Sequence, residues 1–252
     1  MDQTELRQYL DRFISTLKAD EESLLKARLQ GLVSVFPFNE YEYILMFLQD
    51  RGVLAFEDYE RLREQYVAAN RYLNLFGLAP RIFGQVWGEQ HLMDLDQRFK
   101  KPNTSLNGEF EGQYDLYIDG FKVEVKAARA TNTKKRGDPV SKALRSDSQE
   151  PFWMNFQQIK LGIVDVFVFI GVWVDIIRYW VLSDEQVKTS PHCSYQHRGG
   201  IEYQIGVKHT NISDFESFEV EAGQIGNRIL SLTKGKERSG QENKEESTQG
   251  GA

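Results

Sequence analysis

The chain has 252 residues, of which 31 are Lys or Arg and 37 are Asp or Glu, so its formal net charge is −6. This balance excludes a histone-like polycation. With 40% hydrophobic and 27% charged residues, the composition is that of a folded globular protein with one large or two modest domains. The longest apolar run, residues 161–174, is shorter than the ~20 residues of a membrane-spanning helix, so we expect no membrane partner.

The beginning of the chain and its cysteine content bear on location. The N-terminal sequence MDQTELRQYLDRF is charged and lacks the apolar stretch of a secretory signal. Cys193 is the single cysteine of the sequence, so an internal disulfide cannot form. We therefore expect a cytoplasmic protein.

Helical periodicity dominates the first third of the chain. Apolar residues recur every three or four positions in residues 6–17 and again in residues 62–73. Residues 1–78 are therefore predicted to form an N-terminal helical region that serves packing, dimerisation or recognition. A further helix is predicted after Pro80. Its buried side is expected to carry Ile82, Val86 and Trp87.

The remaining chain divides into two parts. Residues 79–233 mix strand and helix patterns and are predicted to form the main domain. Beyond about Lys234 the sequence has no large apolar side chain. Residues 234–252 are therefore predicted to be a disordered polar tail.

The stretch 113–127, QYDLYIDGFKVEVKA, carries the most information. Asp119-Gly120 lies between two alternating segments, which is the strongest short-range signal of a β-hairpin with a type I′ turn. With these two residues as the loop, Asp115 pairs with Glu124. One face of the hairpin is then apolar and packs on the core. The other face carries Asp115, Tyr117, Lys122, Glu124 and Lys126.

On this polar face, the Asp115 and Glu124 carboxylates stand opposite each other with Cβ atoms roughly 5 Å apart, and Lys126 is a diagonal neighbour. Two carboxylates suit Mg²⁺, whose other positions are left to water and a substrate phosphate. The metal can polarise a phosphoryl oxygen, while Lys126 orients or deprotonates the attacking water or stabilises negative charge. The pattern favours phosphodiester hydrolysis. A solvent-exposed strand pair with ordinary surface ion pairs is the alternative.

A cluster of basic residues follows the hairpin directly. Seven of the twenty residues from 126 to 145 are Lys or Arg, and only Asp138 is acidic. Such a local field can attract a polyanion even when the whole chain is acidic, although a solvated loop has the same composition. The candidates for contacts to a DNA backbone are Arg129, Lys134, Lys135, Arg136, Lys142 and Arg145.

The loop-like stretch 196–200 is a second candidate for DNA contacts. His197 and Arg198 can donate to a phosphate or a base edge, and the following glycines permit close approach. A surface turn is the alternative interpretation.

The spacing of Asp115, eight intervening residues and Glu124-Val125-Lys126 resembles the PD-(D/E)xK signature of the restriction-endonuclease-like nuclease superfamily, with Tyr114 in place of the frequent proline. The resemblance implies an α/β (α+β) fold in which a mixed sheet has helices on both faces. It further implies that carboxylates and a main-chain carbonyl bind Mg²⁺ and that the lysine acts on the attacking water. The residues it implicates are Asp115, Glu124, the Val125 carbonyl, Lys126 and, from the preceding helix, Glu89.

This core usually has the order helix, strand, strand, helix, strand. Residues 152–162, FWMNFQQIKLG, are predicted to supply the second helix, with Gln157 and Gln158 as polar positions, and residues 163–170 the last strand. The segments FQQIK, DVFVFIGV and IRYWVLS are similar to those of type II restriction enzymes. The core is expected to span about residues 80–182.

The resemblance implies a Mg²⁺-dependent type II restriction endonuclease that hydrolyses double-stranded DNA at a specific sequence, with a homodimer meeting a symmetric site. A structure-specific nuclease of DNA repair or recombination is the first alternative. A non-catalytic DNA-binding or scaffold protein, in which the hairpin acids are surface residues, is the second.

Overall fold

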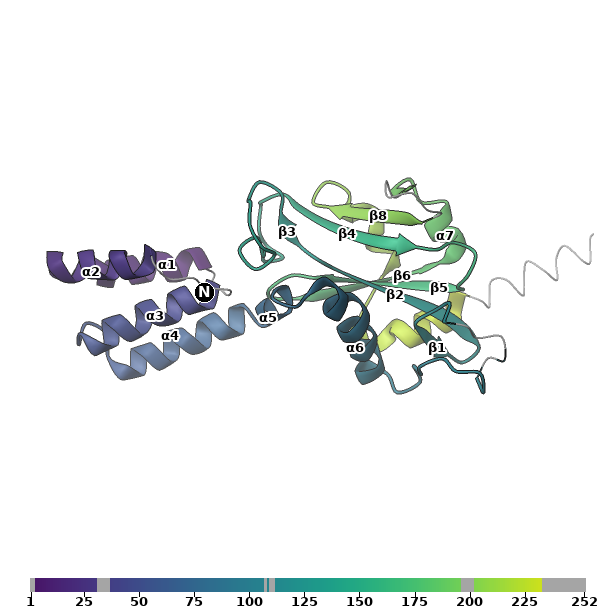
Figure 1. The fold of residues 1–252 in the computed structure, drawn as a ribbon, viewed down its shortest axis with the longest axis horizontal. Helices are drawn as coiled ribbons and strands as arrows, with labels where there is room; N and C mark the ends of the chain where they lie inside the picture. Colours follow the sequence, from purple (N-terminus) through teal and green to yellow (C-terminus); the bar gives the residue numbers. More distant parts are fainter. Residues whose placement is uncertain (1–2, 31–36, 107, 109–111, 196–201, 233–252) are drawn as a thin grey trace, which may run out of the picture. The chain divides into compact units, whose positions relative to one another are not determined.

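The computed structural model describes residues 3–30, 37–106, 108, 112–195 and 202–232 (Figure 1). The chain divides into two compact units, each built from more than one stretch. The first unit consists of Met1–Leu78, Ala130–Phe152 and Trp173–Ile176, and the second of Ala79–Arg129, Trp153–Val172 and Ile177–Ala252. The predicted tail, 234–252, lies outside the described residues.

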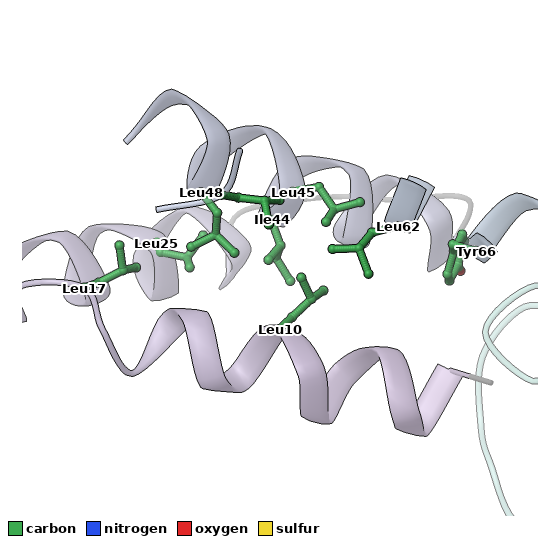
Figure 2. Close-up of a cluster of buried hydrophobic side chains, with 9 residues drawn as sticks. Leu10, Leu17, Leu25, Ile44, Leu45, Leu48, Leu62 and Tyr66 are labelled. Atoms are coloured by element: carbon green, nitrogen blue, oxygen red, sulfur yellow. The ribbon is translucent and has the colours of Figure 1, made fainter. Parts of the chain in front are cut away.

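The first unit begins with helices, in the region where the periodicity predicts them. They are α1 (Gln3–Ile14), α2 (Ala19–Gln30), α3 (Pro37–Asp50), α4 (Phe56–Ala69) and α5 (Leu73–Phe76). Leu10, Ile44, Leu48 and Leu62 are completely buried in one cluster (Figure 2). Because burying such a side chain stabilises a fold by roughly 1.5–3 kcal/mol, this apolar cluster holds the short helices together.

Polar loops complete the first unit. The short strand β3 (Thr131–Asn132) leads into a long loop with little regular structure. The Val174 amide donates to the Leu144 carbonyl at 3.0 Å, and the Val174 carbonyl accepts from the Tyr72 amide at 2.8 Å. These backbone hydrogen bonds order the loop without a helix or sheet.

The second unit is built around a mixed sheet with the strand order β1-β2-β5-β6-β9. β2 and β5 are parallel, and the other neighbours are antiparallel. Every residue of β5 is buried, as expected for a central strand that is covered on both faces. The strands are β1 (Leu116–Ile118), β2 (Phe121–Arg129), β5 (Val166–Val172), β6 (Ile177–Ser183) and β9 (Glu219–Val220).

A second sheet contains β4 (Phe152–Ile159), β8 (Tyr203–Lys208) and β7 (Cys193–Tyr195), in that order and antiparallel. The Phe156 ring lies edge-on against Phe169 of β5, with centroids 4.9 Å apart. In Figure 1, β4 and β8 lie on one side of β2, β5 and β6, and α6 (Gly88–Leu95) lies on the other. The main sheet of this unit is thus covered by a sheet on one face and by a helix on the other.

Short helical segments complete the second unit. The π-helix η1 (Ile82–Trp87) runs directly into α6, and α7 (Asp184–Lys188) follows β6. The Ser183 hydroxyl and the Gln186 side chain cap α7 reciprocally. The remaining segments are η2 (Ile212–Phe218), η3 (Ala222–Gln224) and a helix over residues 225–232.

The helix predicted at 152–162 is wrong, because this segment forms β4. Phe152, Met154 and Phe156 are buried, whereas Trp153 is exposed and Asn155 is half-buried, a period-2 pattern that suits a strand with one face on the core. The expected order of helix, strand, strand, helix, strand is therefore not observed. The face expected to carry a second helix is covered by the β4-β8-β7 sheet.

The predicted buried side of the helix after Pro80 is also partly wrong. Ile82 and Val86 are exposed, whereas Phe83 and Leu92 are buried. The helix begins as a π-helix, whose wider turn inserts one residue and shifts the face that packs on the sheet.

The fold is mixed α and β, with helices and a mixed sheet. Within the described residues, none of the helices has the length and apolar character needed to cross a membrane.

Candidate active site

The hairpin predicted from Asp119-Gly120 is confirmed. Both residues have positive φ angles, 44° and 98°, as a type I′ turn requires. The register pairs Ile118 with Phe121 and Leu116 with Val123, which is the predicted pairing. Burial alternates as expected, since Leu116, Ile118, Val123 and Val125 are buried and the polar positions between them are half-buried.

Asp115 lies just before β1 and is held by the backbone of β2. Its amide donates to the Val123 carbonyl at 3.1 Å, and its Oδ2 accepts from the Val125 amide at 2.8 Å. In a regular β-ladder a backbone carbonyl of the neighbouring strand would accept this hydrogen bond, and here the Asp115 carboxylate takes its place. Asp115 is thereby fixed beside the residue that separates Glu124 from Lys126.

Glu124 and Lys126 point to the same side of β2 because they are two residues apart in a strand. Lys126 Nζ lies 2.6 Å from Glu124 Oε1, and the side chains are only 16% and 12% exposed. Burial raises the pKa of Glu124; Lys126 opposes this shift and the Asp115 charge adds to it. The structure therefore brings Asp115, Glu124 and Lys126 together in a partly desolvated site.

Glu89 is the second residue of α6 and is buried, with 8% of its surface exposed. The helix approaches β2 closely here, since a Cβ on Gly88 would lie 3.5 Å from both Val125 and Ala127 side-chain atoms. The Glu89 carboxylate forms an ion pair with Lys101. Among the described residues, no group of three or more His, Cys, Asp or Glu side chains lies close enough together to hold a metal ion.

The oxygen donors at the hairpin nevertheless fit Mg²⁺ in kind. Hard carboxylate and carbonyl oxygens are its usual protein ligands, and two carboxylates are supplied by Asp115, just before β1, and Glu124, in β2. The N–H and C=O groups of one strand residue point to the same neighbour. The Val125 carbonyl therefore faces the side on which its amide meets Asp115.

The predicted basic cluster is divided between the two units. Arg129 belongs to the second unit, where its guanidinium carbon lies 4.1 Å from the centroid of the Phe83 ring. Burial lowers the pKa of Arg129 to about 10. This side chain packs inside the unit, and its cation–π contact accounts for its position.

The other candidate DNA contacts of this cluster, which follow Arg129 in the chain, belong to the first unit. Lys134 forms an ion pair with Glu150 at 3.3 Å. Lys135 and Arg136 are exposed, and Lys142 is half-buried. His197 and Arg198, from the second candidate for DNA contacts, lie outside the described residues.

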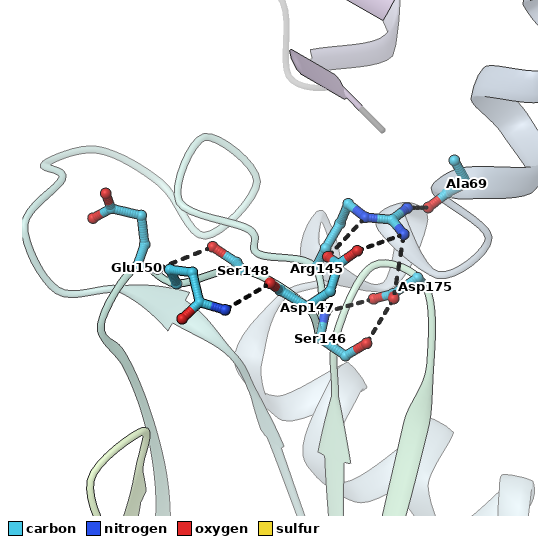
Figure 3. A network of polar contacts seen from close by, with 8 residues as sticks. Ala69, Arg145, Ser146, Asp147, Ser148, Glu150 and Asp175 are labelled. Atoms are coloured by element: carbon cyan, nitrogen blue, oxygen red, sulfur yellow. Dashed lines mark hydrogen bonds and ion pairs between the residues drawn. The ribbon is translucent and has the colours of Figure 1, made fainter. Parts of the chain in front are cut away.

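Arg145 is the centre of a network of polar contacts (Figure 3). Its guanidinium donates to the Ala69 carbonyl at 3.0 Å and to Asp147 at 3.1 Å, and lies 3.8 Å from Asp175. Asp175 also accepts from the amide and hydroxyl of Ser146, at 2.8 and 2.7 Å. These contacts give Arg145 a structural role in the first unit.

Two lysines near the site were not singled out from the sequence. Lys101 pairs with Glu89, and the charge of Lys160, which directly follows β4, opposes the rise in the pKa of Glu124 that burial causes. Both come from segments distant in sequence from the hairpin, and no local pattern marks them. Only the folded chain brings them to the acids.

No protein-family model matches the chain, and no curated protein matches it. Its function is therefore argued from the chemistry of the site.

Proposed function

We propose that this chain is a Mg²⁺-dependent nuclease that hydrolyses phosphodiester bonds of double-stranded DNA, in the manner of a type II restriction endonuclease. The observation that carries the proposal is the half-buried constellation of Asp115, Glu124 and Lys126 on one hairpin, with the lysine 2.6 Å from the glutamate. Its spacing along the chain resembles the PD-(D/E)xK signature. The parallel β2 and β5 strands behind it provide a rigid support.

Asp115, Glu124 and the Val125 carbonyl would hold the metal, with Glu89 as a further carboxylate from α6. When bound, Mg²⁺ polarises a phosphoryl oxygen and lowers the pKa of a coordinated water. The Asp115 carboxylate is kept in place by the Val125 amide. Burial raises the pKa of Glu124, and the charges of Lys126 and Lys160 oppose this rise.

Lys126 would act on the attacking water and on the phosphate. An ammonium group has three donors, so Lys126 can keep its contact with Glu124 and still donate to a water or a phosphoryl oxygen. In hydrolysis the water oxygen forms a new bond to phosphorus and gives up its proton to solvent, while the P–O bond to the leaving group breaks and the released oxygen takes up a proton from solvent. A positive charge at Lys126 stabilises the negative charge that develops on phosphorus-bound oxygens.

A homodimer and a cytoplasmic location belong to the same proposal. Cutting both strands at a symmetric site requires two copies of the hairpin related by a twofold axis. A structure-specific repair nuclease would use the same hairpin chemistry but would read the shape of junctions or flaps.

One observation favours a second candidate, a DNA-binding or scaffold protein without catalysis. Glu124 and Glu89 each have a lysine partner, so these carboxylates are compensated without a metal. On this view Glu124 and Glu89 form ordinary ion pairs with lysines and have no catalytic role. Such a protein would bind DNA, leave it intact and gain no thermal stability from Mg²⁺.

Cleavage of plasmid DNA in Mg²⁺ by Lys126→Ala tests the proposal. We expect the rate to fall by roughly 10²- to 10³-fold, the usual cost of removing one donor that stabilises developing negative charge. Lys188→Ala is a matched control, because Lys188 is also paired with a glutamate but lies on exposed α7. Undiminished cleavage by Lys126→Ala contradicts the assigned role.

The product pattern tests the finer part of the proposal. Discrete fragments from plasmid or bacteriophage DNA favour a restriction endonuclease. Selective cutting of junctions, flaps or nicked duplexes favours the repair alternative. DNA binding by the wild-type chain with no cutting in Mg²⁺ favours the non-catalytic candidate.

A further inference from the structure

The outward face of the β4-β8-β7 sheet has an unusual composition. Burial alternates along β4 and β8, so one set of side chains packs on the main sheet and the other set faces outward. The outward set contains amides, one aromatic ring, one lysine and small residues. We call it the amide face, and its members are Trp153, Asn155, Gln157, Ser194, Gln204, Gly206 and Lys208.

The amide face carries no negative charge. β4, β7 and β8 contain no Asp or Glu, although the chain as a whole has a net charge of −6. Lys208 lies at one end of β4, where it pairs with Trp153, and Lys160 directly follows the other end. A surface with amides at its centre and a lysine at each end is complementary to a polyanion that also offers hydrogen-bonding groups.

Two of the amides contact each other across the strand pair. Asn155 Nδ2 donates to Gln204 Oε1 at 3.2 Å across the strand pair. Asn155 faces Gly206, and a Cβ on that glycine would lie 3.0 Å from the Trp153 indole nitrogen. The missing side chain therefore lets the Trp153 indole lie over Gly206, close to the sheet.

A β-bulge brings further amides outward near the end of β4. The register of β4 against β8 shifts between Phe156 and Ile159, and Gln158 has a φ angle of 58°. As a result, both Gln157 and Gln158 are exposed. Bulges of this kind re-aim side chains and are frequent beside functional sites.

The end of β4 also lies within electrostatic range of the candidate active site. The charge of Lys160, the residue after β4, acts on the Glu124 carboxylate. Gln157 and Gln158 are therefore separated from that charge by only two or three residues of a strand.

We propose that the amide face reads the base edges of duplex DNA in the major groove, an inference that rests on the proposed nuclease function and names its recognition surface. The major groove admits a pair of antiparallel strands, and β4 and β8 are the two longest strands of the sheet that carries the amide face and are antiparallel to each other. Asn and Gln side chains pair with the N6 and N7 groups of adenine, Lys with O6 and N7 of guanine, and an apolar ring with the thymine methyl group.

Selection from a library of duplexes with a randomised centre tests this inference. The immobilised protein is the full chain carrying Lys126→Ala, with Mg²⁺, and the retained duplexes are sequenced. We expect one motif to be enriched. Adding Asn155→Ala, Gln157→Ala or Gln204→Ala relaxes the preference at individual base pairs by roughly 5- to 150-fold, the discrimination of one bidentate contact. Gln49→Ala, an exposed glutamine of α3, leaves the motif unchanged.

The variant Lys208→Ala distinguishes a contact of Lys208 to a phosphate from a contact to a base. If Lys208 contacts a phosphate, its loss weakens binding of all sequences equally and reduces the salt slope by about 1. If it contacts guanine, one position of the motif relaxes. Both outcomes place DNA on the amide face, whereas unchanged binding and an unchanged motif place it elsewhere.

Two results overturn the inference. One is an enriched motif that stays the same in all three amide variants, which would assign recognition to another surface. The other is retention of every duplex alike by the parent protein, which would leave only backbone contacts. Because selection measures binding alone, a motif that depends on the amides together with an uncut plasmid would refute the catalytic proposal and leave this inference standing. Gln157 is exposed, so Gln157→Ala should fold normally. This variant therefore tests the inference even if Asn155→Ala or Gln204→Ala misfolds.

Discussion

Each compact unit contains a cluster of charged side chains, and the two clusters differ in how fully their carboxylates are hydrogen-bonded. The Arg145 cluster, in the first unit, consists of Arg145, Ser146, Asp147 and Asp175. All four carboxylate oxygens in it have a donor, from the guanidinium or from Ser146. This cluster is saturated and explains the order of the surrounding loop.

The hairpin cluster, in the second unit, consists of Asp115, Glu124 and Lys126. Within the described residues, its four carboxylate oxygens receive one hydrogen bond, from the Val125 amide, and one ion pair, from Lys126. The remaining acceptor capacity lies in a partly desolvated place. The hairpin acids thus have acceptor capacity left for a ligand, whereas each carboxylate oxygen of the Arg145 cluster already has a donor.

The largest expected difference between the clusters is in catalysis. Asp115→Asn keeps the shape of the side chain but removes a metal-binding charge worth several kcal/mol of transition-state stabilisation, so cleavage should fall by at least roughly 100-fold. Asp175→Asn is the matched change in the Arg145 cluster and should leave the cleavage rate per folded molecule unchanged. Rates are measured on plasmid DNA in Mg²⁺. Equal losses in both variants would remove the distinction between the clusters.

Metal binding gives the next largest effect. A ligand that binds only the folded protein stabilises it by about 2.7 kcal/mol at one hundred times its Kd, so Mg²⁺ should raise the melting temperature of the wild-type chain. Asp115→Asn should abolish this rise and Asp147→Asn should retain it. The measurement is thermal melting across a Mg²⁺ titration. A rise that survives Asp115→Asn would place the metal elsewhere.

The Arg145 cluster should instead contribute to stability. Arg145→Met leaves the Ala69 carbonyl and the Asp175 carboxylate without the guanidinium, and unmade hydrogen bonds of this kind destabilise by roughly 1–3 kcal/mol. Arg136→Met, at an exposed position of the same loop region, should change stability by less than about 0.5 kcal/mol. Chemical denaturation measures both. If Arg145→Met leaves the free energy of unfolding unchanged, the network does not stabilise the loop.

The sequence predicts the hairpin cluster well because its geometry is local. The Asp119-Gly120 turn fixes the register, and the register alone decides that Asp115, Glu124 and Lys126 share a side. The buried strand β5 was also predictable, since an uninterrupted run of Val and Phe suits a strand covered on both faces.

The rest of the site depends on contacts between distant segments. The helix predicted at residues 152–162 is wrong, although the alternation of Phe152, Met154 and Phe156 with polar or exposed neighbours has the period of a strand. The π-helical turn that moves Phe83 to the buried side has no simple sequence signal. The partners of Glu89 and Arg145 come from loops whose path only the complete fold determines.

The smallest expected difference concerns pH. Burial raises the pKa of Glu124, whereas the hydrogen bond from Arg145 lowers the pKa of Asp147. In metal-free buffer, the Glu124 contribution to the free energy of unfolding is present below the ordinary glutamate pKa and is lost as pH rises through the raised pKa. The Asp147 contribution is present above the ordinary aspartate pKa and is lost as pH falls through the lowered pKa. The two clusters therefore respond to pH in opposite directions.

Thermal melting of the wild type, Glu124→Gln and Asp147→Asn across the acidic range separates these contributions. Without metal, Glu124→Gln should remove a contribution to the free energy of unfolding that declines as pH rises. Asp147→Asn should remove a contribution that declines as pH falls. The Asp147 effect should be the weaker one, because this side chain is 63% exposed and water screens its pair with Arg145. In Mg²⁺ the pH dependence of the Glu124 contribution should reverse, so that this contribution is lost as pH falls. The reason is that a bound cation favours the ionised carboxylate and that protons compete with the cation. A Glu124→Gln curve parallel to that of the wild type, with and without Mg²⁺, would show that this carboxylate keeps its solution pKa and binds no cation.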